Sequence, residues 1–211
     1  MRSFAIKMFL AVMVVAGFSI MAAAQVKTIN FDLHVIPAEV SCLSANGGPT
    51  PTAHVTVQRG LLNDTLTIEG NNFRPHLAFD MFTVQRSRLL ANGNLDPNFT
   101  NFGLAWYQSD LQANALGHFK ATIKTILLDQ IFGFDPDVTL TPTNTFHVGF
   151  WFNDPNDANK NGCTFDITKP TPFNGEHKAG PFAMISAPDP TTQLGPLCTD
   201  PDPEHPGSCK P

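Results

Sequence analysis

The residues best suited to hold a ligand form a run of oxygen-bearing side chains near position 160. Asp157, Asn159 and Asn161 alternate along the chain and a glycine follows them, which matches the first half of a calcium loop, D-x-[DN]-x-[DN]-G. The twelfth loop position, normally a bidentate glutamate, is Thr168, but Asp166 offers a carboxylate two residues earlier. Asp157, Asn159, Asn161 and Asp166 are therefore the candidate calcium ligands. We favour the alternative, an Asn/Asp-rich turn between strands that is stabilised by side-chain bonds to its own backbone.

Cysteine chemistry points to disulfide bonds. The chain has four cysteines and no C-x-x-C pair, so the spacing gives no sign of a zinc or redox motif. An even number in an exported chain indicates two disulfides, and four cysteines allow three pairings. A bond between Cys163 and Cys198 is slightly favoured because it would anchor the C-terminal tail. The predicted disulfide residues are Cys42, Cys163, Cys198 and Cys209.

Signals for catalysis or transition-metal binding are weak. Seven histidines are spread along the chain without an H-x-H or H-x-x-x-H pair, although a sheet could bring distant ones together. No G-x-S-x-G elbow is present, so a serine hydrolase has no motif to support it. Glu176 and His177 are neighbours in a glycine-bounded loop and could serve acid–base chemistry. An extracellular hydrolase or a metal-binding protein would depend on Glu176, His177 and His147.

The elements that position these residues are predicted to be short strands. Apolar residues alternate with polar ones in most of the chain, as in strands with one buried face. The alternating runs lie at 29–35, 55–57, 66–69, 77–84, 102–106, 119–125 and 146–152. Turn signals at 46–49, 92–94, 115–117 and 135–137 separate them. We predict an all-β domain with seven or eight antiparallel strands, at most one short helix, within 124–132, and no internal repeat.

The spacing of strands and turns favours a β-sandwich, either immunoglobulin-like or jelly-roll-like, with a barrel as the second choice. The segment D-T-L-T-I-E-G-N-N-F at 64–73 resembles the early strand of TIG modules, which are immunoglobulin-like. This resemblance implies a sandwich and assigns no activity, because such folds host many functions.

The two ends of the chain differ from its middle. Arg2 and Lys7 precede an apolar run of about 14 residues that ends in three alanines; this pattern is typical of a signal peptide cleaved before Gln25 and is too short to cross a bilayer. From Ala187 onward the chain has seven prolines, which cannot join the centre of a sheet. We predict a signal peptide at 1–24, a domain at 25–186 and an irregular, disulfide-tied tail at 187–211.

Charge and aromatic content restrict the partners. Loss of the signal peptide takes the formal net charge from −5 to −7 with histidine neutral, and no basic stripe is present, so nucleic acid is not expected as a partner. The segments 102–110 and 173–181 could form an aromatic and polar surface with Trp151, but core packing of Trp106 and Trp151 is the favoured interpretation. We expect a secreted, extracellular or periplasmic, non-catalytic binding or structural module. It would have no membrane span after cleavage, an unknown extracellular ligand or protein as partner, and no cofactor other than calcium.

Overall fold

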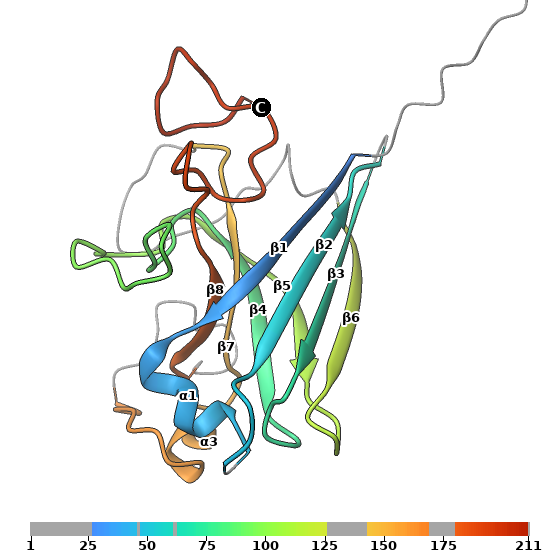
Figure 1. The fold of residues 1–211 in the computed structure, drawn as a ribbon, viewed down its shortest axis with the longest axis vertical. Coiled ribbons are helices and arrows are strands. Elements are labelled where there is room, and N and C mark those ends of the chain that lie inside the picture. Colours follow the sequence, from blue (N-terminus) through green and yellow to red (C-terminus); the bar gives the residue numbers. More distant parts are fainter. Residues whose placement is uncertain (1–26, 46, 61–62, 126–142, 169–179, 211) are drawn as a thin grey trace, which may run out of the picture.

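The computed structural model describes residues 27–45, 47–60, 63–125, 143–168 and 180–210. Its main element is one sheet of eight antiparallel strands in the order β5-β4-β7-β8-β1-β2-β3-β6 (Figure 1). The strands are β1 (Thr28–Val35), β2 (Thr52–Gln58), β3 (Asp64–Asn71), β4 (Ala78–Val84), β5 (Ala105–Gln112), β6 (Phe119–Thr125), β7 (His147–Phe152) and β8 (Phe182–Ser186). The prediction of a nearly all-antiparallel β fold is confirmed.

The sheet forms a nearly closed barrel, which was the second choice of the sequence analysis, and not the favoured β-sandwich. Each strand pairs with its neighbour in one continuous ladder, so no break divides the strands into two layers. β1, for example, pairs with β2 on one side and with β8 on the other. The edge strands β5 and β6 approach each other because a short turn at 113–118 joins them. Alternation predicts which side chains are buried, but it does not predict which strands pair.

Phenylalanine side chains fill the barrel interior. The rings of Phe79 and Phe150 are 4.9 Å apart between centroids, and those of Phe73 and Phe119 are 5.1 Å apart. Gly70 lies against this cluster: a Cβ there would come within 2.3 Å of the Phe119 ring, so only glycine fits the close approach. The many phenylalanines therefore form the core, where a ring without a polar group is needed.

A second apolar cluster lies on the outside of the barrel, over β4, β7 and β8. These three strands are buried on both faces, whereas β2 and β3 alternate between buried and more exposed residues. The segment 85–104 covers the outer face, where Ser87 Oγ donates to the carbonyl oxygen of Ser186 at 2.8 Å. The cluster contains Ile36, Phe82, Val84, Leu89, Phe102, Ala105, Trp151, Phe182 and Ile185.

The described residues form two short α-helices, α1 (Val40–Leu43) and α3 (Pro155–Lys160), and a 3₁₀ turn η1 (Pro37–Glu39). The prediction of at most one helix is therefore wrong. α3 forms because the Asp154 carboxylate accepts from the backbone N–H of Asn156 at 2.8 Å and a proline occupies the first helical position. Of the predicted helix at 124–132, the first two residues lie in β6 and the rest lie outside the described residues. The TIG-like segment forms β3.

The disulfide pairing differs from the one favoured above. The bonds join Cys42 to Cys163 and Cys198 to Cys209, so both disulfides are confirmed and the Cys163–Cys198 pair is wrong. The described part of the tail has no helix or strand, and one bond closes a loop within it. The tail is held to the barrel by hydrogen bonds, such as that from the Cys209 N–H to the Thr143 carbonyl oxygen at 2.8 Å. The described part of the tail therefore lies over the residues that lead into β7 and does not enter the sheet.

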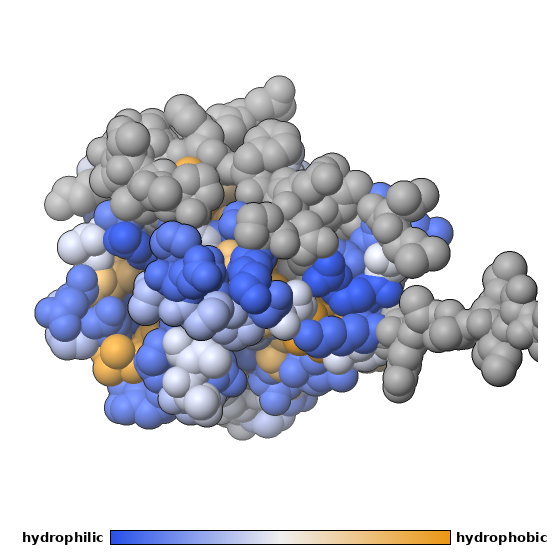
Figure 2. All heavy atoms as spheres, turned by 90° about the horizontal axis from the view of Figure 1, so that it is seen from above, coloured by the Kyte–Doolittle hydropathy of each residue, from blue (hydrophilic) through white to orange (hydrophobic). Residues whose placement is uncertain are grey.

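The helices and the tail lie at opposite ends of the barrel (Figure 1). Seen from above Figure 1, the described surface is mainly hydrophilic, with hydrophobic residues in separate patches (Figure 2). Among the described residues, no helix is long and apolar enough to cross a membrane. The predicted signal peptide lies outside the described residues.

Candidate functional site

A cavity of about 590 Å³ lies on the outer face of β7 and β8, towards the helix end of the barrel. We call it the aromatic pocket. Four separate parts of the chain form it: η1, the segment 85–104, the strands β7 and β8, and the segment after α3. Its lining residues are Glu39, Arg88, Leu95, Asp96, Pro97, Phe99, Phe102, Trp151, Phe165, Pro181 and Phe182.

The rings around the pocket form a connected set. The indole of Trp151 packs against Phe182 and Phe102, with centroid distances of 4.5 and 5.1 Å. Phe102 in turn contacts Phe99 edge-to-face at 4.7 Å. Because each ring fixes the next in such arrangements, the wall of the pocket is preorganised. Phe165 completes the lining from the segment after α3.

Glu39 places an acidic group in this mainly apolar wall. Its residue is only 8% exposed, and burial raises the pKa of its carboxyl group above the usual value, while the charge of Arg88 opposes that shift. Among the described residues, no basic group lies within 4 Å of this carboxylate. A buried carboxyl group without an ion-pair partner marks a place where a ligand charge or donor would be stabilised.

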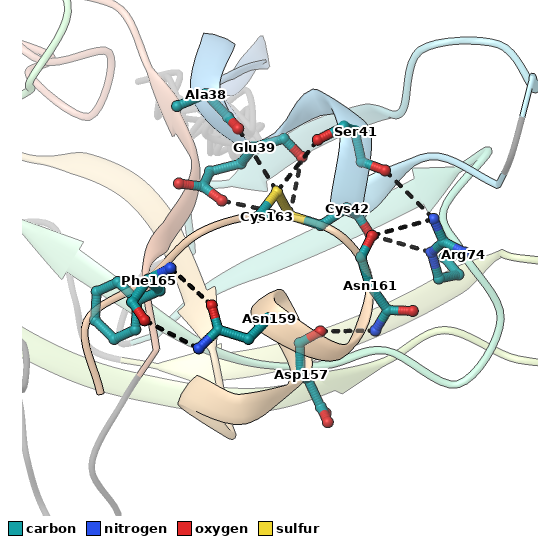
Figure 3. The surroundings of a disulfide bond; sticks show 10 residues. All are labelled: Ala38, Glu39, Ser41, Cys42, Arg74, Asp157, Asn159, Asn161, Cys163 and Phe165. Carbon is teal, nitrogen blue, oxygen red and sulfur yellow. Dashed lines mark hydrogen bonds between the residues drawn. A yellow bond between two sulfur atoms is a disulfide. The ribbon is translucent and has the colours of Figure 1, made fainter. Parts of the chain in front are cut away.

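The Cys42–Cys163 disulfide positions Glu39 and Phe165 (Figure 3). It joins α1, which follows η1, to the segment after α3, and Glu39 Oε2 lies 3.3 Å from Cys42 Sγ. The guanidinium of Arg74 reinforces this junction by donating to the carbonyl oxygens of Ser41, Cys42 and Asn161. Two sides of the pocket, far apart in sequence, are thereby held at a constant separation.

The predicted calcium residues lie beside this disulfide, and most of their side chains already have protein partners. The Asn159 amide donates to the Phe165 carbonyl at 2.9 Å and accepts from the Phe165 N–H at 2.7 Å. Asn161 Nδ2 donates to the Asp157 carbonyl, and the Asp157 carboxylate pairs with Lys160 at 3.1 Å. Asp166 accepts from the N–H and hydroxyl of Thr168. Asn159 therefore holds Phe165 at the pocket, and calcium coordination stays a prediction.

The other candidate groups are placed as follows. Glu176 and His177 lie outside the described residues, so their proximity to His147 stays a prediction. His147 is buried, with Nδ1 3.1 Å from both oxygens of Ser186. The described residues contain one group of possible metal ligands, Glu39 with Cys42 and Cys163. Because both sulfur atoms are in a disulfide, neither can ligate as a thiolate.

The two tryptophans have different environments. Trp151 is fully buried in the outer cluster, as the core-packing interpretation predicts, whereas Trp106 is 42% exposed and Tyr107 47% exposed on the edge strand β5. A hydrogen bond at 2.8 Å joins the Tyr107 hydroxyl to Asp110. Desolvation is the main reason why the pKa of Tyr107 is raised to about 12, and the hydrogen bond with Asp110 adds to the shift. The favoured core-packing interpretation is therefore confirmed for Trp151 and wrong for Trp106, which lies on the edge strand β5.

Comparisons with protein-family models, with curated proteins and with solved structures found no match to this chain. The assignment of the aromatic pocket as a functional site therefore depends on the geometry of the pocket alone. Sequence reasoning missed Glu39 because the P-A-E segment carries no motif. It gave a common surface of the segment 102–110 with Trp151 only as the less favoured interpretation, whereas the rings of Phe102 and Trp151 lie 5.1 Å apart between centroids.

Proposed function

We propose that the protein is an exported, non-catalytic binding module whose aromatic pocket takes a small organic cation, such as an alkylammonium compound. The observation that carries this proposal is a buried carboxyl group, Glu39, in a cavity of about 590 Å³ with aromatic walls. The volume lies within the range of small-molecule sites, roughly 300 to 1,000 Å³. Aromatic faces attract ammonium groups through the ring quadrupole.

Charge around the pocket supports a cation as the ligand. Glu39 and Asp96 contribute two acidic groups and Arg88 one basic group, which leaves the pocket acidic when both carboxyl groups are ionised. Arg88 is exposed, so its guanidinium can turn towards water when a cation enters. A cation beside Glu39 favours the ionised carboxylate, and the desolvation that raises its pKa is then compensated by the ligand.

Export is part of the same proposal. The two disulfides indicate a non-reducing environment, and the pattern at residues 1–24 supports a cleaved signal peptide. The aromatic pocket depends on the Cys42–Cys163 bond, which joins the two segments that supply Glu39 and Phe165. Secretion would therefore supply the oxidising conditions in which this site forms.

Fluorescence titration tests the ligand class. The chain has two tryptophans, so a Trp106→Phe background leaves Trp151, in the pocket wall, as the only reporter. We expect choline to bind about tenfold more tightly than its neutral analogue in which carbon replaces the ammonium nitrogen. The ionised Glu39 carboxylate attracts the cation and the aromatic faces add to this attraction, and a tenfold preference corresponds to about 1.4 kcal/mol.

Two variants assign the preference to the pocket. Glu39→Gln keeps the size of the side chain and should remove most of the tenfold preference for choline. Arg88→Ala removes the positive charge beside Glu39 and should strengthen choline binding. Circular dichroism of both variants is the control for correct folding. Equal affinity for choline and the neutral analogue, or no fluorescence change with either, contradicts the proposed ligand class.

A further inference from the structure

A second cavity, of about 460 Å³, lies at the tail end of the barrel. We call it the polar pocket. Three segments meet there: 85–101, the chain leading into β7, and the C-terminal tail. The tail is fixed at this place because the Gly195 N–H donates to Thr145 Oγ at 2.7 Å and the Leu197 N–H donates to the Phe146 carbonyl. The polar pocket is a different cavity from the aromatic pocket, although Asp96 and Phe99 contribute to both.

His147 lies in the wall of the polar pocket with one ring nitrogen available. The residue is 3% exposed and Nδ1 lies 3.1 Å from the Ser186 carbonyl oxygen. Ser186 is buried and does not line the cavity, so Nδ1 is directed away from the cavity and Nε2 is the ring nitrogen that can reach it. A hydrogen bond from Nδ1 to that carbonyl leaves a lone pair on Nε2, and among the described residues Nε2 has no hydrogen-bond partner.

Three further groups complete the chemistry of the polar pocket. The Arg86 side chain is exposed, and no described residue accepts a hydrogen bond from its guanidinium. Asp96 Oδ1 accepts from the Asn98 N–H at 2.8 Å, which leaves its other oxygen available. Phe99 offers a half-buried ring. The pocket therefore presents a neutral acceptor, a cationic donor, an anionic acceptor and an apolar face.

This combination indicates the class of ligand. The charges of Arg86 and Asp96 balance, so the polar pocket has no net preference for an anion or a cation. Each hydroxyl group of a sugar both donates and accepts a hydrogen bond, and the C–H face of a sugar ring is apolar. We infer that the polar pocket is a binding site for a neutral sugar, independent of the cation proposed for the aromatic pocket.

Saturation-transfer NMR on the full mature protein tests this inference. The probes are glucose, galactose, mannose and N-acetylglucosamine, each at millimolar concentration. We expect signal transfer to at least one of them, with the ring protons on one face receiving most of it because that face contacts Phe99. No transfer to any of the four sugars overturns the inference.

Matched arginine variants assign the binding to the polar pocket. Arg86 and Arg88 are both exposed and two positions apart, but Arg86 lines only the polar pocket and Arg88 only the aromatic pocket. Arg86→Ala should weaken sugar binding about tenfold, since hydrogen bonds to a charged group contribute strongly. Arg88→Ala should leave sugar binding unchanged. Equal effects of the two variants, or no effect of Arg86→Ala, overturn the assignment.

A histidine variant tests the proposed acceptor. His147→Asn keeps a donor near the position of Nδ1 for the Ser186 carbonyl and removes Nε2, so it should also weaken sugar binding about tenfold. If this variant does not fold, Arg86→Ala still decides the result, because its side chain lies at the surface. Choline titration of the same variants separates the two sites. Arg86→Ala and His147→Asn should leave choline affinity unchanged, and a wild-type protein that binds a sugar but not choline contradicts only the aromatic-pocket proposal.

Discussion

Acidification should destabilise the protein through His147. Burial lowers the pKa of this imidazole to about 4 from the ordinary value of 6.5, and the hydrogen bond with Ser186 opposes the shift only in part. Between pH 6.5 and about pH 4, His147 is therefore mostly protonated in the unfolded chain and mostly neutral in the folded protein. The stabilisation is complete above pH 6.5 and is lost as the pH falls from 6.5 to 4.

The size of the effect follows from the two pKa values. With 1.36 kcal/mol per pKa unit, the His147 contribution to the free energy of unfolding falls by about 1.8 kcal/mol between pH 7 and pH 5. Glu39 acts in the opposite direction because its raised pKa favours the folded state on acidification. The aspartates with lowered pKa values act mainly below pH 4, since their ordinary value is 3.8.

Urea unfolding with intact disulfides, at pH 7, 6 and 5, measures this effect. His147→Asn removes the titrating group, so the loss of stability between pH 7 and pH 5 should be smaller by about 1.8 kcal/mol than in the wild type. Glu39 is present in both proteins and cancels in this comparison. His76→Asn is the matched control, because His76 is exposed and its φ of 66° suits asparagine. The same pH dependence in the wild type and His147→Asn would refute the reasoning.

Three further predictions concern the disulfides, the calcium loop and the aromatic pocket. Replacing Cys42 and Cys163 by serine should lower the free energy of unfolding by about 5 kcal/mol, because this bond spans 121 residues. Replacing Cys198 and Cys209 by serine should lower it by about 3 kcal/mol, because that bond spans 11 residues. Urea unfolding measures both losses, and a larger loss for the Cys198–Cys209 bond contradicts the prediction. Thermal melts in millimolar calcium and in EDTA should give the same Tm, since Asn159 is engaged by Phe165; a higher Tm in calcium would support the calcium loop. Choline affinity should fall with decreasing pH through the raised pKa of Glu39, because protonation removes the charge that attracts the cation. Fluorescence titration measures this fall, and the Glu39→Gln variant should lack it.

Local patterns predicted several strands and the two faces of each, even for a strand that is buried on both sides. The alternation at 146–152 correctly separates Phe150 on the inside of the barrel from Trp151 on the outside. It does not indicate that the outer face is also buried, because the covering segment 85–104 is far away in sequence. The helix α3 was missed because an Asn/Asp-rich segment can form either a turn or a capped helix.

The amino-acid sequence by itself determined an antiparallel β protein with two disulfides. Side-chain alternation is a local property of each strand, and the number of cysteines can be counted without knowing which of them pair. Only the tertiary structure decided that the strands form one nearly closed barrel and that Cys42 pairs with Cys163. It also placed Glu39 among Trp151, Phe165 and Phe182, and it showed that Asn159 of the predicted calcium loop holds Phe165. These are contacts between residues far apart in sequence, and they depend on strand pairing and loop packing, which no local pattern specifies.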